Sequence, residues 1–107
     1  MAVRANVDEL IAALNDQSPK VRRSAAEMLG ELEDVRAAQP LTQALKDGDA
    51  DVRLSIALAL GMIGDTSATA SLNHASKDEQ DEAVRGAIEI ALDMIKKKVM
   101  GKKMRLF

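Results

Sequence analysis

The chain has 107 residues, which is enough for one domain with one core, and 47% of them are apolar, as is usual for globular proteins. It contains no cysteine, which excludes disulfides, thiolate metal sites and cysteine nucleophiles, and Phe107 is its only aromatic residue. The net charge of −2 is unevenly distributed: residues 1–93 carry −8 and residues 94–107 carry +6, which predicts an acidic body with a basic tail.

A core without Phe, Tyr or Trp must be built from Ala, Leu, Ile, Val and Met. These residues favour helix packing, whereas sheets draw on aromatic and β-branched residues. The N-terminus lacks the apolar stretch of a signal peptide, and the apolar run 54–63 is too short to span a bilayer. We therefore expect an all-α protein of the cytoplasm.

Six helices are predicted along the chain, in three pairs. The first helix of each pair, called A, is expected at residues 7–15, 37–46 and 67–76. The second, called B, is expected at residues 19–33, 50–63 and 80–98. No apolar run shows sustained period-2 alternation, so no strand is predicted.

The first B helix shows the signals most clearly. Ser18 followed by Pro19 is typical of a helix start, because serine caps the helix and proline in first position loses no hydrogen bond. One apolar helix face is then formed at the expected spacing by Val21, Ala25, Met28, Leu29 and Leu32. Asp49 is expected to cap the second B helix.

The same residues recur every 31 to 32 positions. The pair Val-Arg occurs at 21–22, 52–53 and 84–85, the pair Leu-Gly occurs at 29–30 and 60–61, and leucines occur at 10, 41 and 72. One helix pair cannot bury its apolar face alone, so three pairs are expected to stack into a short α-solenoid. We place the repeats at about 7–34, 37–65 and 67–95 within a domain of residues 1–95, followed by a tail at 96–107.

This pattern resembles the HEAT-like repeats of the phycobilisome-lyase type. The residues that carry the resemblance are the run Ser18-Pro19-Lys20-Val21-Arg22, Ala25-Ala26 and Leu29-Gly30, and in the second repeat Asp51-Val52-Arg53, Ala57 and Leu60-Gly61. The third repeat departs from the pattern, with Asp93 in place of the glycine and Ser76 in place of Leu14 and Leu45. The resemblance implies the solenoid fold but no particular function, because such repeats serve many roles.

Two columns of charged residues accompany the repeat, namely Asp16, Asp47 and Asp78 after the A helices and Arg22, Arg53 and Arg85 in the first turns of the B helices. Stacking aligns the columns, and an arginine fork bridges carboxylates or carbonyls of neighbouring turns. The resemblance implies such a ladder between units. The alternative is a row of arginines that binds anions.

No catalytic or metal site is predicted. His74, the only histidine, stands four residues before Asp78, but one histidine and one carboxylate are too few for a closed zinc or iron site. The resemblance includes hydroxylases that bind iron through His-Glu pairs, and this chain has no such pair. Bilin lyases with these repeats are much longer. We expect no enzyme activity, no cofactor and no small-molecule substrate.

The outward faces of the B helices differ in polarity. Arg23, Glu27 and Glu31 of the first correspond to Leu54, Leu58 and Met62 of the second and to Gly86, Ile90 and Met94 of the third. We call the set Leu54, Leu58, Met62, Ile90 and Met94 the B-face stripe. It predicts an apolar groove on the concave surface, and monomers rarely leave such patches open. Alternatively, the helix phase differs by one position and these residues belong to the core.

Three candidates exist for what covers the B-face stripe: a second copy of the chain, a helix of another protein, or the chain's own tail. The tail at 96–107 is basic with an apolar side, and Gly101 is expected to end or loosen its helix. It is expected to be solvated, to dock on the groove or to touch a protein. Nucleic acid or an anionic membrane is less favoured, because the body is acidic and offers no aromatic stacking platform.

The sequence therefore predicts a non-catalytic scaffold that binds another protein, or a second copy of itself, through the B-face stripe. One alternative is an accessory or assembly subunit of an enzyme, such as a bilin-lyase-like factor. The other is weak association with nucleic acid through the tail.

Overall fold

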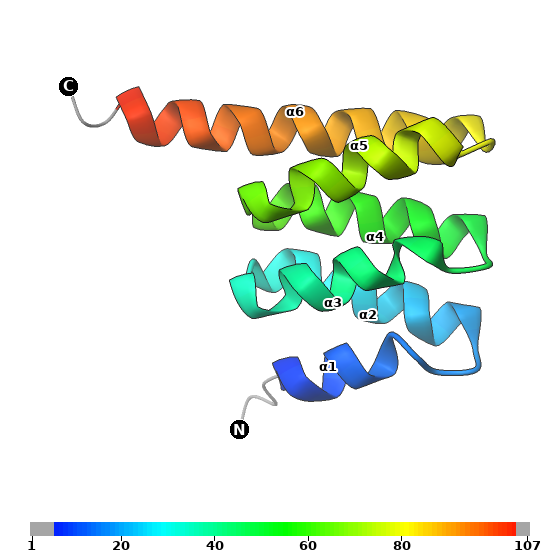
Figure 1. Cartoon of the computed structure of the whole chain (residues 1–107). Coiled ribbons are helices and arrows are strands. Elements are labelled where there is room, and N and C mark those ends of the chain that lie inside the picture. Colours follow the sequence, from blue (N-terminus) through cyan, green and yellow to red (C-terminus); the bar gives the residue numbers. More distant parts are fainter. Residues whose placement is uncertain (1–5, 105–107) are drawn as a thin grey trace.

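The computed structural model describes residues 6–104, with side chains up to residue 102. Within that range six α-helices form two layers (Figure 1). The A layer contains α1 (Val7–Ala13), α3 (Ala38–Gln43) and α5 (Thr69–Asp78), and the B layer contains α2 (Pro19–Leu32), α4 (Ala50–Ile63) and α6 (Glu82–Met104). The stack measures 46 × 43 × 18 Å. The predicted all-α solenoid of three helix pairs is confirmed.

Short 3-10 turns adjoin the A helices. The turns η1 (Val35–Ala37) and η3 (Thr66–Ala68) precede α3 and α5, and η2 (Ala44–Lys46) follows α3. The second A helix, expected as one element at 37–46, is therefore divided into a short α-helix with a 3-10 turn on each side.

Each B helix begins where a side chain accepts a hydrogen bond from the first turn. Ser18 accepts from the amide of Val21 at 3.4 Å, and Asp49 accepts from the amide of Val52 at 3.1 Å. Asp81 does the same before α6, accepting from the amide of Val84 at 3.1 Å. The three caps fix the same register in all three repeats, which aligns the B helices side by side.

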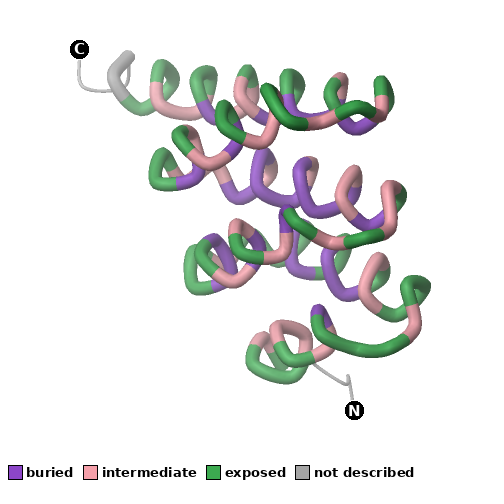
Figure 2. Tube along the Cα trace, turned by 45° about the vertical axis from the view of Figure 1, so that its right-hand side comes forward, coloured by how far each residue is buried: buried purple, intermediate pink, exposed green. Residues whose placement is uncertain are grey.

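The core lies between the two layers and between successive B helices, and buried residues gather in the middle of the stack (Figure 2). Helix α4 packs against α2 on one side and α6 on the other, which explains why it is apolar almost all round. The largest fully buried side chains are Leu29, Leu41, Ile56, Leu60, Leu72, Ile88, Val52 and Val84.

Glycines let the B helices approach closely. A methyl group added at Gly30 would lie 2.9 Å from the Cα of Ala59, and one added at Gly61 would lie 2.8 Å from the Cα of Ala91. Real Cβ atoms essentially never come so close to backbone. The Leu-Gly pair of the repeat is therefore a packing signal between neighbouring B helices.

The first B helix is less buried than its pattern predicts. Ala25 and Leu29 are buried, but Val21, Met28 and Leu32 remain substantially exposed. These three residues lie on the edge of α2 that faces away from α4, where the described residues supply no neighbouring B helix. The apolar face predicted on α2 is therefore only partly buried.

Gly101 does not end the last helix, because α6 continues through it to Met104. The expected boundary between the repeats and the tail, near residue 95, consequently lies inside a continuous helix. A glycine inside a helix costs only about 1 kcal/mol relative to alanine, which a long packed helix tolerates.

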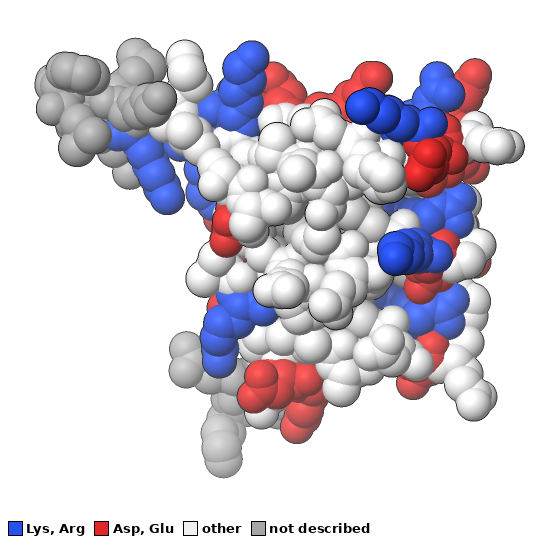
Figure 3. Space-filling model, viewed as in Figure 1, with Lys and Arg blue, Asp and Glu red and all other residues white. Residues whose placement is uncertain are grey.

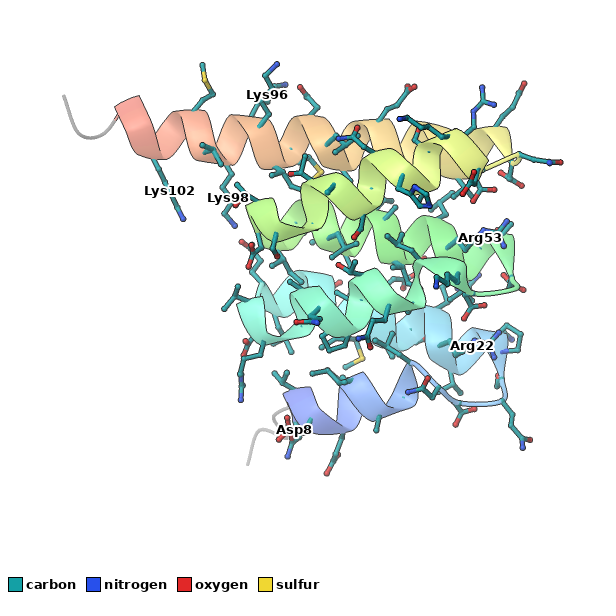
Figure 4. All side chains as sticks on the ribbon, in the orientation of Figure 1. Asp8, Arg22, Arg53, Lys96, Lys98 and Lys102 are labelled. Atoms are coloured by element: carbon teal, nitrogen blue, oxygen red, sulfur yellow. The ribbon has the colours of Figure 1, made fainter. Side chains whose placement is uncertain are left out.

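Lys98 joins the three repeats at the end of the stack opposite Arg22 and Arg53 (Figure 4). Its Nζ donates to the backbone oxygens of Met62 at 3.3 Å and Ile63 at 3.0 Å, at the C-terminus of α4. It also donates to Oε1 of Glu33, just after α2, at 3.0 Å. A cation at a helix C-terminus is favourable because the unpaired carbonyls there carry negative charge.

We expect Gly64→Ala to lower the free energy of unfolding by about 1–2 kcal/mol. Gly64 ends α4 with φ of +75°, a conformation that strains any residue with a Cβ atom. The added methyl group would also run into the side chain of Lys98. Denaturation in urea measures the change. Gly48→Ala is the control, because nothing lies within 4 Å of a Cβ there, and equal stability of the two variants would contradict the prediction.

Candidate partner-binding site

The B-face stripe comes from two adjacent helices. Helix α4 supplies Leu54, Leu58 and Met62, and α6 supplies Ile90 and Met94. Ile90 is 55% exposed, whereas the other four side chains are partly buried. Leu54 and Leu58 pack against the core. The stripe is therefore only partly exposed, and some of its side chains also pack against the core. Its role in binding stays a prediction.

The two methionines of the stripe lie over the seams between B helices. The sulfur of Met62 is 3.2 Å from the place of a Cβ on Gly30, and that of Met94 is 3.0 Å from the place of a Cβ on Gly61. Each methionine therefore covers the glycine of the preceding repeat. Flexible thioether side chains in such positions can adapt their shape to a bound partner.

Beside the stripe, α2 presents charge on the same layer. Arg23 and Glu27 are exposed or partly exposed and lie 3.9 Å apart, and Glu31 follows one turn later. At these equivalent positions the B layer therefore changes from charged at α2 to apolar at α4 and α6. Such a surface suits a partner with one apolar face and a polar margin.

Charged residues at the turns between the A and B helices pair across repeats. Arg22 donates from Nε to Oδ2 of Asp47 at 2.7 Å and from Nη2 to Oδ1 at 3.1 Å. Arg53 likewise donates to the two oxygens of Glu79 at 2.9 and 3.2 Å. Each arginine also donates to a backbone oxygen of its own repeat, Arg22 to Asp16 and Arg53 to Asp47, both at 2.8 Å. The result is a ladder in which the arginine of one repeat binds the acid of the next.

Asp78 is not the third acid of this ladder, and its place is taken by Glu79. The acid stands five residues before the Val-Arg pair in every repeat, as Asp16, Asp47 and Glu79 do. The third repeat is one residue longer, so a fixed spacing of 31 selects Asp78 instead. Counting back from Val84 would have found Glu79 in the sequence. Asp78 instead lies 3.5 Å from His74, and both side chains are highly exposed.

The ladder changes the acidity of its members. Burial raises the pKa of the Asp47 carboxyl, but the hydrogen bonds from Arg22 and from the amide of Asp49 outweigh it, so that the pKa is lowered overall. The hydrogen bond from Arg53 lowers the pKa of Glu79. The pKa values of Arg22 and Arg53 are raised, mainly by the same hydrogen bonds. These two arginines are committed to internal partners, which disfavours the alternative of an anion-binding row.

The two ends of the ladder differ from its middle. At one end, the carboxylate of Asp16 accepts a hydrogen bond from the amide of Ser18, and within the described residues no arginine donates to that carboxylate. At the other end, Arg85 is exposed and forms no ion pair within that part of the chain. The ladder therefore consists of two complete rungs.

The A layer offers a different surface. Its face is largely uncharged in the middle, with charged side chains along its margins (Figure 3). A hollow of about 810 Å³ lies between α3 and α5, with Thr42, Leu45, Ser71, His74 and Ala75 among its lining residues. In residues 6–104 no three His, Asp or Glu side chains come together in a way that would hold a metal ion.

Comparison with known proteins identifies the family. Residues 7–93 match the family model described as HEAT repeats. The chain belongs to the HEAT-repeat family. The match covers most of this HEAT-repeat chain and extends from the first helix pair into the last helix of the third. A search of curated proteins gives no match.

Solved structures of several other proteins are similar to this chain. Human deoxyhypusine hydroxylase in complex with glycerol is 32% identical over 84% of this chain, with a TM-score of 0.77. The complex of CpcE and CpcF of phycocyanin lyase from Nostoc sp. PCC7120 is 28% identical over 89% of this chain, with a TM-score of 0.79. An epoxyqueuosine reductase is 30% identical over 70% of this chain, with a TM-score of 0.66. The resemblance to phycobilisome-lyase-type repeats is thus confirmed.

This HEAT-repeat chain is much shorter than these proteins. It spans 32% of the hydroxylase chain, 39% of the lyase chain and 20% of the reductase chain. None of the helices within residues 6–104 is long and apolar enough to cross a membrane.

Proposed function

We propose that this HEAT-repeat chain is a non-catalytic scaffold of the cytoplasm that binds another protein through the B-face stripe. The observation that carries the proposal is the change in polarity across the B layer. Where α2 presents Arg23, Glu27 and Glu31, the same positions of α4 and α6 present apolar side chains, with Ile90 the most exposed. More than half of Ile90 is left exposed, and that part adds no buried apolar area to the fold itself.

The partner that fits best is an amphipathic helix. Its apolar side would lie along α4 and α6 over Leu58 and Ile90, as helices do in grooves of other proteins. Basic residues at one margin would face Glu27 and Glu31 of α2. Met62 and Met94 would adapt to its side chains.

A second candidate is an accessory or assembly subunit of an enzyme. It is supported by the likeness to the lyase proteins CpcE and CpcF, which form a complex with each other. In that case the partner is another subunit, and the B-face stripe remains its binding surface. Association with nucleic acid is less supported, because two lysines of the tail are already paired: Lys97 lies 3.0 Å from Asp93 and Lys98 lies 3.0 Å from Glu33.

The proposal is tested by comparing the intact chain with three variants in binding to proteins from its source cells. Ile90→Asp and Leu58→Asp place a charge in the stripe, and Asn73→Asp places the same charge on the exposed surface of α5 in the A layer. We expect the two stripe variants to bind a purified partner more than about tenfold more weakly and Asn73→Asp to bind normally. Ile90 is decisive, because an exposed side chain can be changed without unfolding the chain.

The dependence of binding on salt concentration distinguishes binding through the B-face stripe from binding through the tail. Binding through the stripe should depend only weakly on salt, through the pairs of the partner with Glu27 and Glu31, whereas binding through the basic tail should weaken steeply as salt rises. A partner that binds Ile90→Asp as well as the unchanged chain would contradict the proposal.

A further inference from the structure

An uncovered apolar strip runs along the edge of α2 that faces away from α4. Val21, Met28 and Leu32 are 41%, 41% and 46% exposed, and their spacing places them on one face of the helix. We call these three residues the α2 edge. The corresponding positions in the other two B helices are at most 6% exposed, namely Val52, Ala59 and Ile63 in α4 and Val84, Ala91 and Ile95 in α6.

Inside the stack, these positions form the contact with the preceding B helix. Ala59 lies against Gly30 of α2, and Ala91 lies against Gly61 of α4. The α2 edge consists of the equivalent positions of the first repeat, but no B helix among residues 6–104 packs against it. The A layer shows the same difference, because Leu10 is only partly buried while Leu41 and Leu72 are fully buried. Burying such a strip is favourable in proportion to its apolar area.

The opposite end of the stack cannot supply the missing neighbour from a second copy. Helix α6 has Glu89 and Asp93 at the positions where α2 has Ala26 and Gly30, and both are exposed. These charged side chains would stand where the interior contacts need a small residue against backbone. Head-to-tail stacking of copies is therefore opposed, and a pairing of two identical edges remains.

The charges of α2 favour such a pairing. Its first turns carry Lys20 and Arg23, and its later turns carry Glu27 and Glu31, with no acidic residue in the first turn and no basic residue in the last. This order is the reverse of what the helix dipole favours, so it does not stabilise α2 by itself. Beside a second α2 that runs in the opposite direction, Lys20 of each copy would lie next to Glu31 of the other. The two helix dipoles would also oppose each other.

The sizes of the side chains also fit together in such an antiparallel pair. In an antiparallel pair centred between residues 26 and 27, Val21 meets Leu32 of the other copy. Met28, the largest residue of the edge, meets the small residues Ser24 and Ala25. We propose that the α2 edge is a self-interface, through which two copies of the chain pair as an antiparallel dimer about a two-fold axis. This surface is separate from the B-face stripe, so the dimer leaves the stripe open.

The mass of the intact chain in solution, followed by light scattering and sedimentation over a range of concentrations, tests the proposal. We expect a dimer. Met28→Lys should raise its dissociation constant more than about tenfold, because it buries an unpaired charge in the centre of the pair. Ile90→Lys is the matched control, since it adds the same charge to an exposed apolar residue of the B-face stripe and should leave the dimer intact. Helical circular dichroism shows whether each variant is folded.

A charge exchange tests the antiparallel register. Lys20→Glu should weaken the dimer, and Lys20→Glu combined with Glu31→Lys should restore it. A chain that stays monomeric overturns the proposal and means that residues 1–5 or another protein cover the strip. A dimer that is lost with Ile90→Lys but kept with Met28→Lys overturns it as well. The first outcome leaves partner binding through the B-face stripe untouched, because that binding is measured with Ile90→Asp and Leu58→Asp. The second outcome would instead make the stripe the surface through which two copies pair.

Discussion

Gly61→Ala is expected to lower the free energy of unfolding by about 1–3 kcal/mol, although alanine is the better helix former. The new methyl group would lie 2.8 Å from the Cα of Ala91 and 3.0 Å from the sulfur of Met94. The methionine can turn away, but the backbone of α6 cannot move without opening its contact with α4. This contact is among the most extensive between two helices of the stack, so its loss affects the whole chain.

Gly86→Ala provides a matched control with the opposite sign. Gly86 also lies within a B helix, but nothing is within 4 Å of a Cβ at that position. Alanine there should raise the free energy of unfolding by about 0.5–1 kcal/mol, since it restricts the unfolded chain and favours the helix. Unfolding in urea measures both variants. If both proved stabilising, the close approach of α4 and α6 would not exist in solution.

Arg53→Met is expected to lower the free energy of unfolding by about 1–3 kcal/mol. The substitution removes the two hydrogen bonds to Glu79 and one to the backbone oxygen of Asp47. Methionine retains much of the packing, but the Glu79 carboxylate, whose side chain is only 9% exposed, loses its cation. Arg85→Met is the control. Its arginine is exposed at the open end of the ladder, so the change should remain within about 0.5 kcal/mol.

The free energy of unfolding of Arg53→Met and of Arg85→Met should also depend differently on pH. Because Glu79 and Asp47 have lowered pKa values in the folded chain, their contribution to stability is present above their ordinary values of 4.5 and 3.8. It is lost as the pH falls from there through the folded values. Arg53→Met removes the contribution that ionised Glu79 makes to the free energy of unfolding. The stability of this variant should therefore fall less steeply in acid than that of the unchanged chain. Equal slopes for Arg53→Met and Arg85→Met would contradict the role of the ladder.

The repeat explains why so much of the fold could be predicted. A glycine, a Val-Arg pair and a capping residue recur at one period, and each has a local meaning that needs no knowledge of distant residues. The helix starts at Pro19 and Ala50 follow from their caps, and the close contact of B helices follows from Gly30 and Gly61. The B-face stripe also came from comparing equivalent positions, although its half-buried state did not.

Most of what the sequence did not reveal depends on contact between residues far apart in the chain. Lys98 and Glu33 are 65 positions apart, so no local pattern links them. The exposure of Val21 and Met28 depends on whether a neighbouring helix exists, and their spacing alone cannot show that. Glu79 is different, because the sequence does contain its signal. It was hidden by one extra residue in the third repeat.

The bridge made by Lys98 has a consequence for how the stack opens. In a solenoid, each repeat usually touches only its neighbours, and an end repeat can fray without disturbing the rest. Here one side chain of the third repeat holds the last carbonyls of the second and a carboxylate at the end of the first. Local fraying of the final turns of α6 therefore removes a contact from every repeat at once. Opening of α6 around Lys98 is therefore felt at the C-terminal ends of α2 and α4 as well, although the core between the helices is not involved.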